Sequence, residues 1–184
     1  MQTIQINRQD IAKQVRQTGA AMLEALAAFD EQQVNTPPFD GGWTAGQVIE
    51  HLLLSAGLLD VITGRTATAD REPDEKMDAI RDVFLDYTVR LQSPEGIRPS
   101  TGPFEKREML EKLKLVWVRQ GEAVRLLDLS RVCLDFELPV FGHLTRLEWI
   151  MFYVYHSQRH LRQLKRLFAA IQARPPHPLA LPRG

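Results

Sequence analysis

The chain has 184 residues, of which 44% are hydrophobic and 25% are charged, which is enough for one globular domain with a sizeable core. Lysine plus arginine and aspartate plus glutamate are equal at 23 each, so the neutral net charge disfavours nucleic acid or an anionic membrane as a partner. The single cysteine, Cys133, excludes an internal disulfide framework and fits a reducing compartment, where we expect it to be a small buried filler.

The first residues, MQTIQINRQDIAK, lack the charged and then apolar layout of a signal peptide. The most apolar stretch, VIEHLLLSAGLLDVIT, is interrupted by Glu50, His51 and Asp60, which is unfavourable for a membrane-spanning helix. We therefore expect a soluble, cytoplasmic protein with no membrane partner.

Helical periodicity begins early in the chain. A first helix is predicted from Arg8 to about Gln33, because Ile11, Val15, Met22, Leu26 and Phe29 recur at the spacing of one buried stripe. After the loop VNTPPFDGGW, the sequence Thr44-Ala45-Gly46-Gln47 matches a capping box, so a second helix should run from Thr44 to about Thr63. A shorter helical pattern then carries Met77, Ile80, Phe84, Tyr87 and Leu91.

The second half of the chain continues with a connection, Ser93 to Pro103, which holds three prolines and two glycines and either spans a crossover or covers a site. Helical spacing resumes at Phe104 and ends before LSRVCLDFELPVFGH, which has little periodicity and is expected to be partly extended. A last long helix is predicted from Thr145 to Ile171.

These elements predict an all-α fold, a four-helix bundle with an extra short helix and no convincing sheet. We expect one domain over residues 1–174, followed by a proline-rich tail over residues 175–184.

Two histidines stand four residues apart in the last predicted helix, in the stretch YHSQRHLRQL. The face centred on His156 also carries Trp149, Phe152, His160 and Leu167, so both imidazoles are predicted to point into the core. The spacing lets two rings approach one metal ion, but buried histidines that only make hydrogen bonds produce the same pattern.

A third histidine, His51, shares its face of the second predicted helix with Val48, Ser55, Leu58 and Ile62, and should also point inward. Three imidazoles from two helices could then meet in the core. Three nitrogen ligands with an open position for water suit Zn²⁺ and would admit Ni²⁺, Fe²⁺ or Mn²⁺. The pattern leaves open whether these two helices are neighbours.

Three segments together resemble the DinB/YfiT-like superfamily, in particular its DinB_2-type branch. They are GGWTAGQVIEHLLLS around His51, FGHLTRLEWIMFYVYHSQRHLRQLKRL around His156 and His160, and the proline-bearing connection between them. The order is a tryptophan, a helix with a histidine in its middle and, much later, FG-x-LT-x-x-EW followed by H-x-x-x-H. The resemblance covers nearly the whole chain and implies a four-helix bundle with a long crossover between the second and third helices.

The resemblance further implies a divalent metal held by His51, His156 and His160, with zinc or nickel favoured over iron or manganese. Members often form dimers, so a homodimer is an expected assembly. Some characterised members are transferases or isomerases that act with a thiol, so a small-molecule substrate and a low-molecular-weight thiol cosubstrate are expected partners.

The chain departs from the family pattern in one place. Relatives commonly have a histidine before the proline of the P-x-F/W-G turn, whereas this chain has Leu138 before Pro139. His143 follows the glycine turn and is expected to be an exposed loop residue, and His177 lies among the prolines of the tail and is expected to be solvated.

Four residues are candidate proton carriers: Gln47, Glu50, Glu148 and Tyr153. Glu50 should point away from the metal because its neighbour His51 points inward, and Glu148 is as readily a surface residue favoured by the dipole of its helix. No general base is therefore assigned.

Other conspicuous side chains are expected to be structural. Trp43 should staple the start of the second helix onto the bundle, in preference to stacking on a substrate. Arg159, Arg162 and Arg166 should form a solvated ridge, although an acidic thiol cofactor could use one of them near the metal.

The sequence thus supports two hypotheses. The first is a metal-dependent hydrolase or thiol S-transferase with water on the open position of the metal, and the second is a non-catalytic bundle whose histidines serve stability, sensing or core hydrogen bonding. An open fourth position favours the enzyme and a closed one favours the structural protein. Because ligation needs neutral imidazole, metal affinity is predicted to fall as pH drops through the usual histidine pKa.

Overall fold

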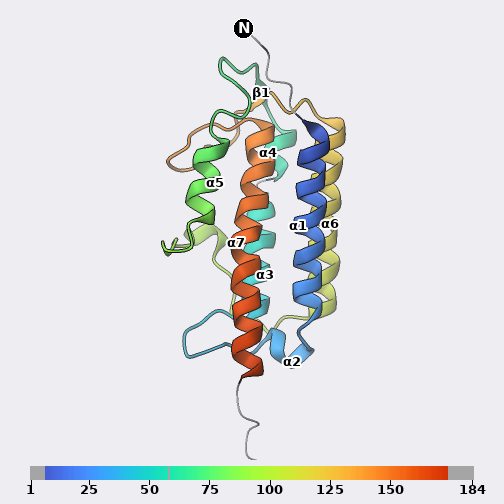
Figure 1. Ribbon diagram of the computed structural model, residues 1–184, viewed down its shortest axis with the longest axis vertical. Coiled ribbons are helices and arrows are strands. Elements are labelled where there is room, and N and C mark those ends of the chain that lie inside the picture. Colours follow the sequence, from blue (N-terminus) through green and yellow to red (C-terminus); the bar gives the residue numbers. More distant parts are fainter. Residues whose placement is uncertain (1–6, 58, 174–184) are drawn as a thin grey trace, which may run out of the picture.

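Four main helices form the predicted bundle in the computed structural model, which describes residues 7–57 and 59–173 (Figure 1). They are α1 (Arg8–Ala27), α3 (Ala45–Ala56), α6 (Lys106–Leu126) and α7 (Arg146–Gln172). Helices α1 and α7 run in one direction and α3 and α6 in the other, as the colour gradient in Figure 1 shows. Helices α1 and α3 each lie against both α6 and α7, so the core is the space that the four helices enclose.

The long crossover follows from this arrangement. Helices α3 and α6 are neighbours that run in the same direction, and such helices cannot be joined by a short turn. The chain instead returns along the bundle through α4 (Leu59–Thr63), β1 (Thr66–Ala67), α5 (Met77–Leu85) and the 3-10 turn η1 (Glu95–Ile97). Helix α5, the extra helix of the prediction, lies against the outer side of α7 (Figure 1).

Capping boxes start the two helices that carry the candidate ligands. At α3, the hydroxyl of Thr44 accepts a hydrogen bond from Gln47 N at 3.1 Å, and Gln47 Oε1 accepts one from Thr44 N at 3.0 Å. Thr145 and Glu148 form the same pair of bonds at the start of α7. The predicted start of the second helix is confirmed, and α7 spans almost exactly the predicted range.

Two predicted helices are interrupted. The first ends at Ala27, and residues Glu31–Val34 form a separate short helix, α2, because Asp30 and Gln33 make a capping box of their own. The second ends at Ala56, and α4 follows after Gly57. The hydrophobic period continues through both breaks, and for this reason periodicity alone predicted single helices.

Two further expectations need correction. Helix α5 ends at Leu85, before the predicted Tyr87 and Leu91, because the carbonyl groups of Phe84 and Asp86 accept hydrogen bonds from the guanidinium of Arg159. A small sheet exists where none was predicted: β1 pairs antiparallel with β2 (Val132–Cys133), with Thr66 opposite Cys133. Strands of two residues are too short to show an alternating pattern.

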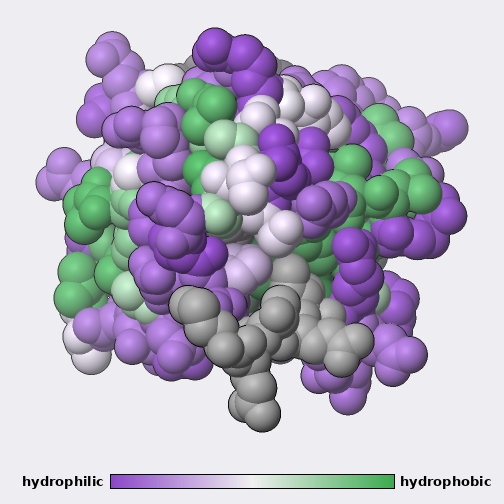
Figure 2. All heavy atoms as spheres, turned by 90° about the horizontal axis from the view of Figure 1, so that it is seen from above, coloured by the Kyte–Doolittle hydropathy of each residue, from purple (hydrophilic) through white to green (hydrophobic). Residues whose placement is uncertain are grey.

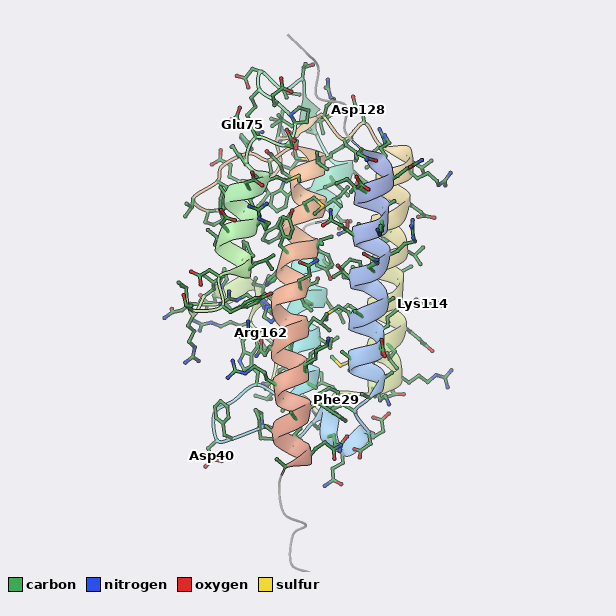
Figure 3. All side chains as sticks on the ribbon, in the orientation of Figure 1. Phe29, Asp40, Glu75, Lys114, Asp128 and Arg162 are labelled. Atoms are coloured by element: carbon green, nitrogen blue, oxygen red, sulfur yellow. The ribbon has the colours of Figure 1, made fainter. Side chains whose placement is uncertain are left out.

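The core follows the predicted apolar stripes. At one end of the bundle Phe29 packs edge to face against Phe168, with ring centroids 5.1 Å apart, and Figure 3 shows Phe29 beside α7 near that end. Trp117 packs against Tyr153 at 5.3 Å and occupies the place where a Cβ on Gly19 would lie, so α1 and α6 approach closely. Cys133 is buried, and burial raises the pKa of its thiol to about 11, as suits a filler.

Within residues 7–57 and 59–173, one stretch, Ala45–Thr63, is long and apolar enough to cross a membrane by length and composition alone, with a mean hydropathy of 1.4. In the structure 62% of its most apolar window is buried inside the molecule, which is the behaviour of a core helix. The surface at the end of the bundle shown in Figure 2 mixes polar and apolar side chains, with several separate apolar patches. The predicted tail over residues 175–184 lies outside the described residues.

Candidate metal centre

Three imidazoles meet between α3 and α7. His51 lies in the middle of α3, and His156 and His160 lie one turn apart in α7. The Nε2 atom of His156 is 3.1 Å from Nε2 of His51 and 3.0 Å from Nε2 of His160. All three side chains are buried, and their ligand atoms lie within 4.8 Å of one another. The two helices are therefore neighbours, which the sequence pattern had left open.

Hydrogen bonds set the tautomers of two of these histidines. His51 Nδ1 lies 2.8 Å from the carbonyl oxygen of Ile97, and because a carbonyl only accepts, Nδ1 must carry the proton. His160 Nδ1 lies 2.8 Å from Gln163 Oε1, which places its proton in the same way. Both rings then present the lone pair of Nε2 to the centre of the cluster.

His156 is held differently. Its Nδ1 is buried and has no hydrogen-bond partner among the described residues. The ring is instead enclosed by Phe152, stacked at 5.6 Å between centroids, and by the edge of Phe84 at 5.5 Å. In the metal-free protein, a proton on His156 Nε2 can be donated to the Nε2 lone pairs of His51 and His160. If the proton of His156 is on Nδ1 instead, the Nε2 lone pairs of all three rings point at one place, where an ion could bind.

The three imidazoles are neutral at physiological pH. Burial lowers the pKa of His160 to about 3, and burial with the neighbouring imidazoles and Arg159 holds the pKa of His156 well below its usual range. Burial also lowers the pKa of His51, although its hydrogen bond to the Ile97 carbonyl opposes that shift. The predicted loss of metal affinity therefore moves to a lower pH than the usual histidine pKa suggests.

The donor set suits a divalent metal. Two imidazole ligands at 2.0 to 2.1 Å from a tetrahedral zinc ion are separated by about 3.3 Å. The two Nε2 separations of 3.0 and 3.1 Å are close to that value before any adjustment of the rings. The three rings are mutually inclined, with centroids 4.7 to 5.0 Å apart. His51, His156 and His160 could hold one ion.

The connection from Ser93 to Pro103 covers one side of this cluster. Ile97 bonds His51 directly, and Ser93 Oγ lies 3.3 Å from His51 Nδ1. Ser100 is bonded to α3 through Glu50 and Gln47. These contacts agree with the alternative in which this segment covers a site, here the histidine cluster. Trp43 packs its ring 5.3 Å from that of His51, so besides preceding the helix it forms part of the wall.

None of the four candidate proton carriers contacts the imidazoles through its polar group. Tyr153 donates to the carbonyl of Leu52 at 3.2 Å, and burial raises its pKa. Gln47 belongs to the capping box, and Glu50 points away from the cluster, as expected, to bond Ser100.

The sequence left two roles open for Glu148, a proton carrier or a surface residue, and the second is wrong. Its side chain is fully buried and receives two hydrogen bonds from Arg71, both at 2.7 Å, and one from the backbone of Lys76 at 2.8 Å. Arg71 lies in a loop that has no hydrophobic periodicity. The contact of this loop with the start of α7 could therefore not be predicted from the sequence. Glu148 is an anchor for that loop.

The arginines of α7 are not all solvated. Arg159 is partly buried and donates to the carbonyl groups of Phe84, Asp86 and Val89, which ties the chain after α5 to α7. Arg162 is exposed and lies 4.2 Å over the ring of Tyr87, on the side of α7 seen in Figure 3. Arg166 is exposed, as predicted for the ridge.

The remaining histidines lie apart from the cluster. His143 is half-buried rather than exposed, and its Nε2 lies 3.1 Å from Glu137 Oε1. His177 lies outside the described residues.

Two important contacts were missed by the sequence analysis. Gln163 could have been found, because a residue three positions after His160 on a helix lies beside it. The carbonyl of Ile97 could not, because any residue type supplies a carbonyl and only the path of the crossover brings this one to His51.

The chain is similar to several known proteins. The chain is 25% identical over 154 residues to "Uncharacterized protein YuaE" of Bacillus subtilis, an alignment that covers 80% of this chain and 90% of that protein. It is also 25% identical over 154 residues to a "Putative metal-dependent hydrolase" of Bacillus licheniformis, which covers 82% of this chain and 79% of that protein.

Two solved structures share the fold. YfiT from Bacillus subtilis, described as "a probable metal-dependent hydrolase with an unusual four-helix bundle topology", matches with a TM-score of 0.56 and 18% identity over 94% of this chain and 92% of YfiT. The four-helix bundle protein TT2238 matches with a TM-score of 0.51 and 20% identity over 87% of this chain and 99% of TT2238. The pattern of the DinB superfamily (DinB_2) matches residues 14–164, and the protein therefore belongs to the DinB superfamily.

Proposed function

We propose that this protein is a metal-dependent hydrolase whose divalent ion is held by the Nε2 atoms of His51, His156 and His160. The observation that carries the proposal is the convergence of three buried imidazoles with no fourth histidine, cysteine, aspartate or glutamate in the cluster, among residues 7–57 and 59–173. Three protein ligands and an open position are typical of catalytic zinc sites, whereas structural sites use four.

The names of the relatives support the same function. Several proteins about 25% identical over most of this chain carry the name "Putative metal-dependent hydrolase". An ion in such a site supplies acidity, because it lowers the pKa of a coordinated water and polarises the bond under attack. Three imidazoles favour zinc or nickel and admit iron or manganese.

Neighbouring residues fix the tautomers and the ring positions that the three histidines need to bind an ion. The Ile97 carbonyl and Gln163 hold the Nδ1 protons of His51 and His160, so that both Nε2 atoms are free to ligate. Phe84 and Phe152 fix the ring of His156 by packing. Burial keeps all three groups neutral, so no imidazolium has to lose its charge before an ion enters. Only His156 has to change its tautomer, by moving its proton from Nε2 to Nδ1.

Hydrolysis is favoured over the thiol S-transferase alternative by one contact. An acidic thiol cosubstrate would need a cationic side chain beside the metal to bind its negative charge. Arg159 is the candidate, because its charge lowers the pKa values of His156 and His160 and it therefore lies near them. Its guanidinium is occupied by backbone carbonyl groups, among them Phe84 and Asp86. Hydrolysis uses water, which is neutral and needs no cationic side chain to bind it.

Elemental analysis tests the metal site. Protein purified without tag or chelator should hold about one equivalent of metal per chain, and the His51→Ala and His156→Ala variants should hold little. His143→Ala is the matched control, since His143 lies outside the cluster and should leave the metal content unchanged. Absence of metal in the wild type after reconstitution with zinc, nickel and manganese would overturn the site.

Chromogenic ester, amide and phosphoester substrates then test the reaction. Hydrolysis that follows metal content across the same variants is the expected result. A fully loaded wild type that hydrolyses none of these substrates would favour the non-catalytic alternative, in which the ion serves stability or sensing.

A further inference from the structure

We propose that Glu50 is a positioning residue for the metal centre, acting through Ser100 and the Ile97 carbonyl on His51. The inference rests on the proposed three-histidine site and concerns how tightly that site holds its ion. Glu50 follows Ile49 and precedes His51 on α3, so one helix carries both a ligand and the group that secures the ligand's partner.

The first step is a set of bonds that we call the Ser100 clasp, formed by Gln47, Glu50 and Ser100. Glu50 Oε2 accepts from the backbone N of Ser100 at 2.5 Å, and Glu50 Oε1 accepts from its hydroxyl at 3.2 Å. Gln47 Nε2 donates to the carbonyl of Ser100 at 3.0 Å. Every polar group of Ser100 is therefore bonded to a side chain of α3.

The second step is the short stretch between Ser100 and Ile97. It holds only Arg98 and Pro99, and the ring of Pro99 fixes its own φ and restricts the residue before it to an extended conformation. Arg98 has that conformation, with φ −70° and ψ 133°. The 3-10 turn is closed by a hydrogen bond from Ile97 N to the carbonyl of Pro94 at 3.2 Å. A shift of Ser100 is therefore transmitted to Ile97.

The third step is the bond from His51 Nδ1 to the Ile97 carbonyl, 2.8 Å long. Partners of this kind orient metal-ligating histidines and fix their tautomer, and losing one typically weakens metal binding about 10- to 100-fold. Ile97 supplies a main-chain oxygen, so no substitution at position 97 removes it. The position of that oxygen depends on what holds the segment.

The packing around Ser100 is incomplete. An open pocket of about 250 Å³ lies beside the clasp, and its lining includes Glu50, Leu53, Ser100, Phe104, Met109 and Lys112. Side chains that border a cavity have fewer contacts to resist displacement. The hydrogen bonds of Glu50, together with that of Gln47, therefore restrain Ser100, and through it the Ile97 carbonyl.

The test compares the zinc affinity of the wild type, Glu50→Ala and Glu50→Gln by competition with a chromophoric chelator. Glu50→Ala should bind zinc about tenfold more weakly than the wild type. This is the low end of the range for residues that hydrogen-bond a metal ligand, because Glu50 acts on the Ile97 carbonyl only through Ser100. Glu50→Gln keeps an acceptor for Ser100 N and should recover to within about threefold of the wild type.

Two measurements separate positioning from general stability. The absorption spectrum of the cobalt(II)-loaded protein reports ligand geometry and should change in Glu50→Ala but not in Glu111→Ala. Glu111 is the matched control, an exposed glutamate of α6 paired with Arg107. Pro99→Gly leaves the clasp intact but loosens its link to Ile97, and it should weaken zinc binding about threefold.

The outcomes are distinct. Equal zinc affinities and equal cobalt spectra in the wild type and Glu50→Ala would overturn this inference and leave the metal site standing. A wild type that binds neither zinc nor cobalt would overturn the proposed function and this inference together.

Discussion

Two buried polar clusters lie on α7, two helical turns apart, and they differ in how their hydrogen-bonding groups are satisfied. At the start of the helix, Glu148 is fully buried and accepts four hydrogen bonds, two from Arg71 and one each from the backbone of Lys76 and Thr145. The bond to Glu148 also raises the pKa of Arg71. Donors and acceptor match in number and charge, so the cluster is complete.

The imidazole cluster is not complete in this sense. The Nε2 atoms of His51 and His160 are both acceptors, and both face His156, whose Nδ1 has no partner among the described residues. Leaving a buried polar group unpaired costs about 1–3 kcal/mol. In the metal-free cluster the single N–H of His156 faces two Nε2 acceptors. A divalent ion can satisfy all three Nε2 atoms at once, whereas His156 Nδ1 stays without a partner among the described residues.

The comparison separates two uses of buried polarity. A saturated cluster has nothing left to bind and serves the fold, whereas an unsaturated one retains capacity for a ligand. Three changes test this difference, from the largest expected effect to the smallest.

Removing the carboxylate of the saturated cluster should destabilise the fold and spare the metal site. Glu148→Ala leaves Arg71 without its partner and should lower the free energy of unfolding by about 3 kcal/mol, measured by urea denaturation. Zinc affinity should stay within about twofold of the wild type, because the effects of distant sites are nearly independent.

Glu148→Gln is the control for that variant. It removes the charge but retains the side chain that a capping box requires, so its loss of stability should be smaller. A tenfold loss of zinc affinity in either variant would show that the two clusters are coupled.

Acid should destabilise the metal-free protein through the imidazoles. The unfolded chain protonates His51, His156 and His160 near pH 6.5, whereas burial lowers all three pKa values in the folded chain, that of His160 to about 3. The unfolded state then binds more protons below pH 6.5, so stability is highest above that pH and falls as pH decreases. We expect a loss of about 1 kcal/mol each from His156 and His160 between pH 7.5 and 5.5, and a smaller loss from His51, whose hydrogen bond to the Ile97 carbonyl opposes the shift.

Urea denaturation of the metal-free protein at pH 7.5, 6.5 and 5.5 measures this loss. In His156→Ala one of the two strongly shifted imidazoles is gone, so the dependence on pH should shrink by between about one third and one half. An unchanged dependence in that variant would contradict the burial of a neutral His156.

The smallest effect is expected where a single outer partner is removed. Gln163→Ala takes away the acceptor for His160 Nδ1 and should weaken zinc binding about tenfold, with little change in the stability of the metal-free protein. Calorimetric titration with zinc measures the first quantity. Gln158→Ala is a matched control on the same helix, since Gln158 bonds Thr18 and not an imidazole.

Much of the three-histidine cluster could be predicted from the sequence. Helical periodicity placed His156 and His160 on one buried face, and the capping box at Thr44 marked the start of the helix that carries His51. Whether the two faces meet depends on the arrangement of the helices, and only the resemblance to a known family indicated it. Glu148 was misjudged, because a T-x-x-E capping box shows where a helix begins and not whether its carboxylate is buried.

The sequence by itself determined where the main helices begin, which faces they bury and which three histidines point inward. These features depend on signals within one or two turns of helix, namely apolar spacing and capping residues. The tertiary structure decided what surrounds them: the Ile97 carbonyl at His51, the Ser100 clasp, Arg71 at Glu148 and the two-residue strands of the sheet. These contacts join residues more than 40 positions apart, so they depend on the path of the crossover and not on local sequence.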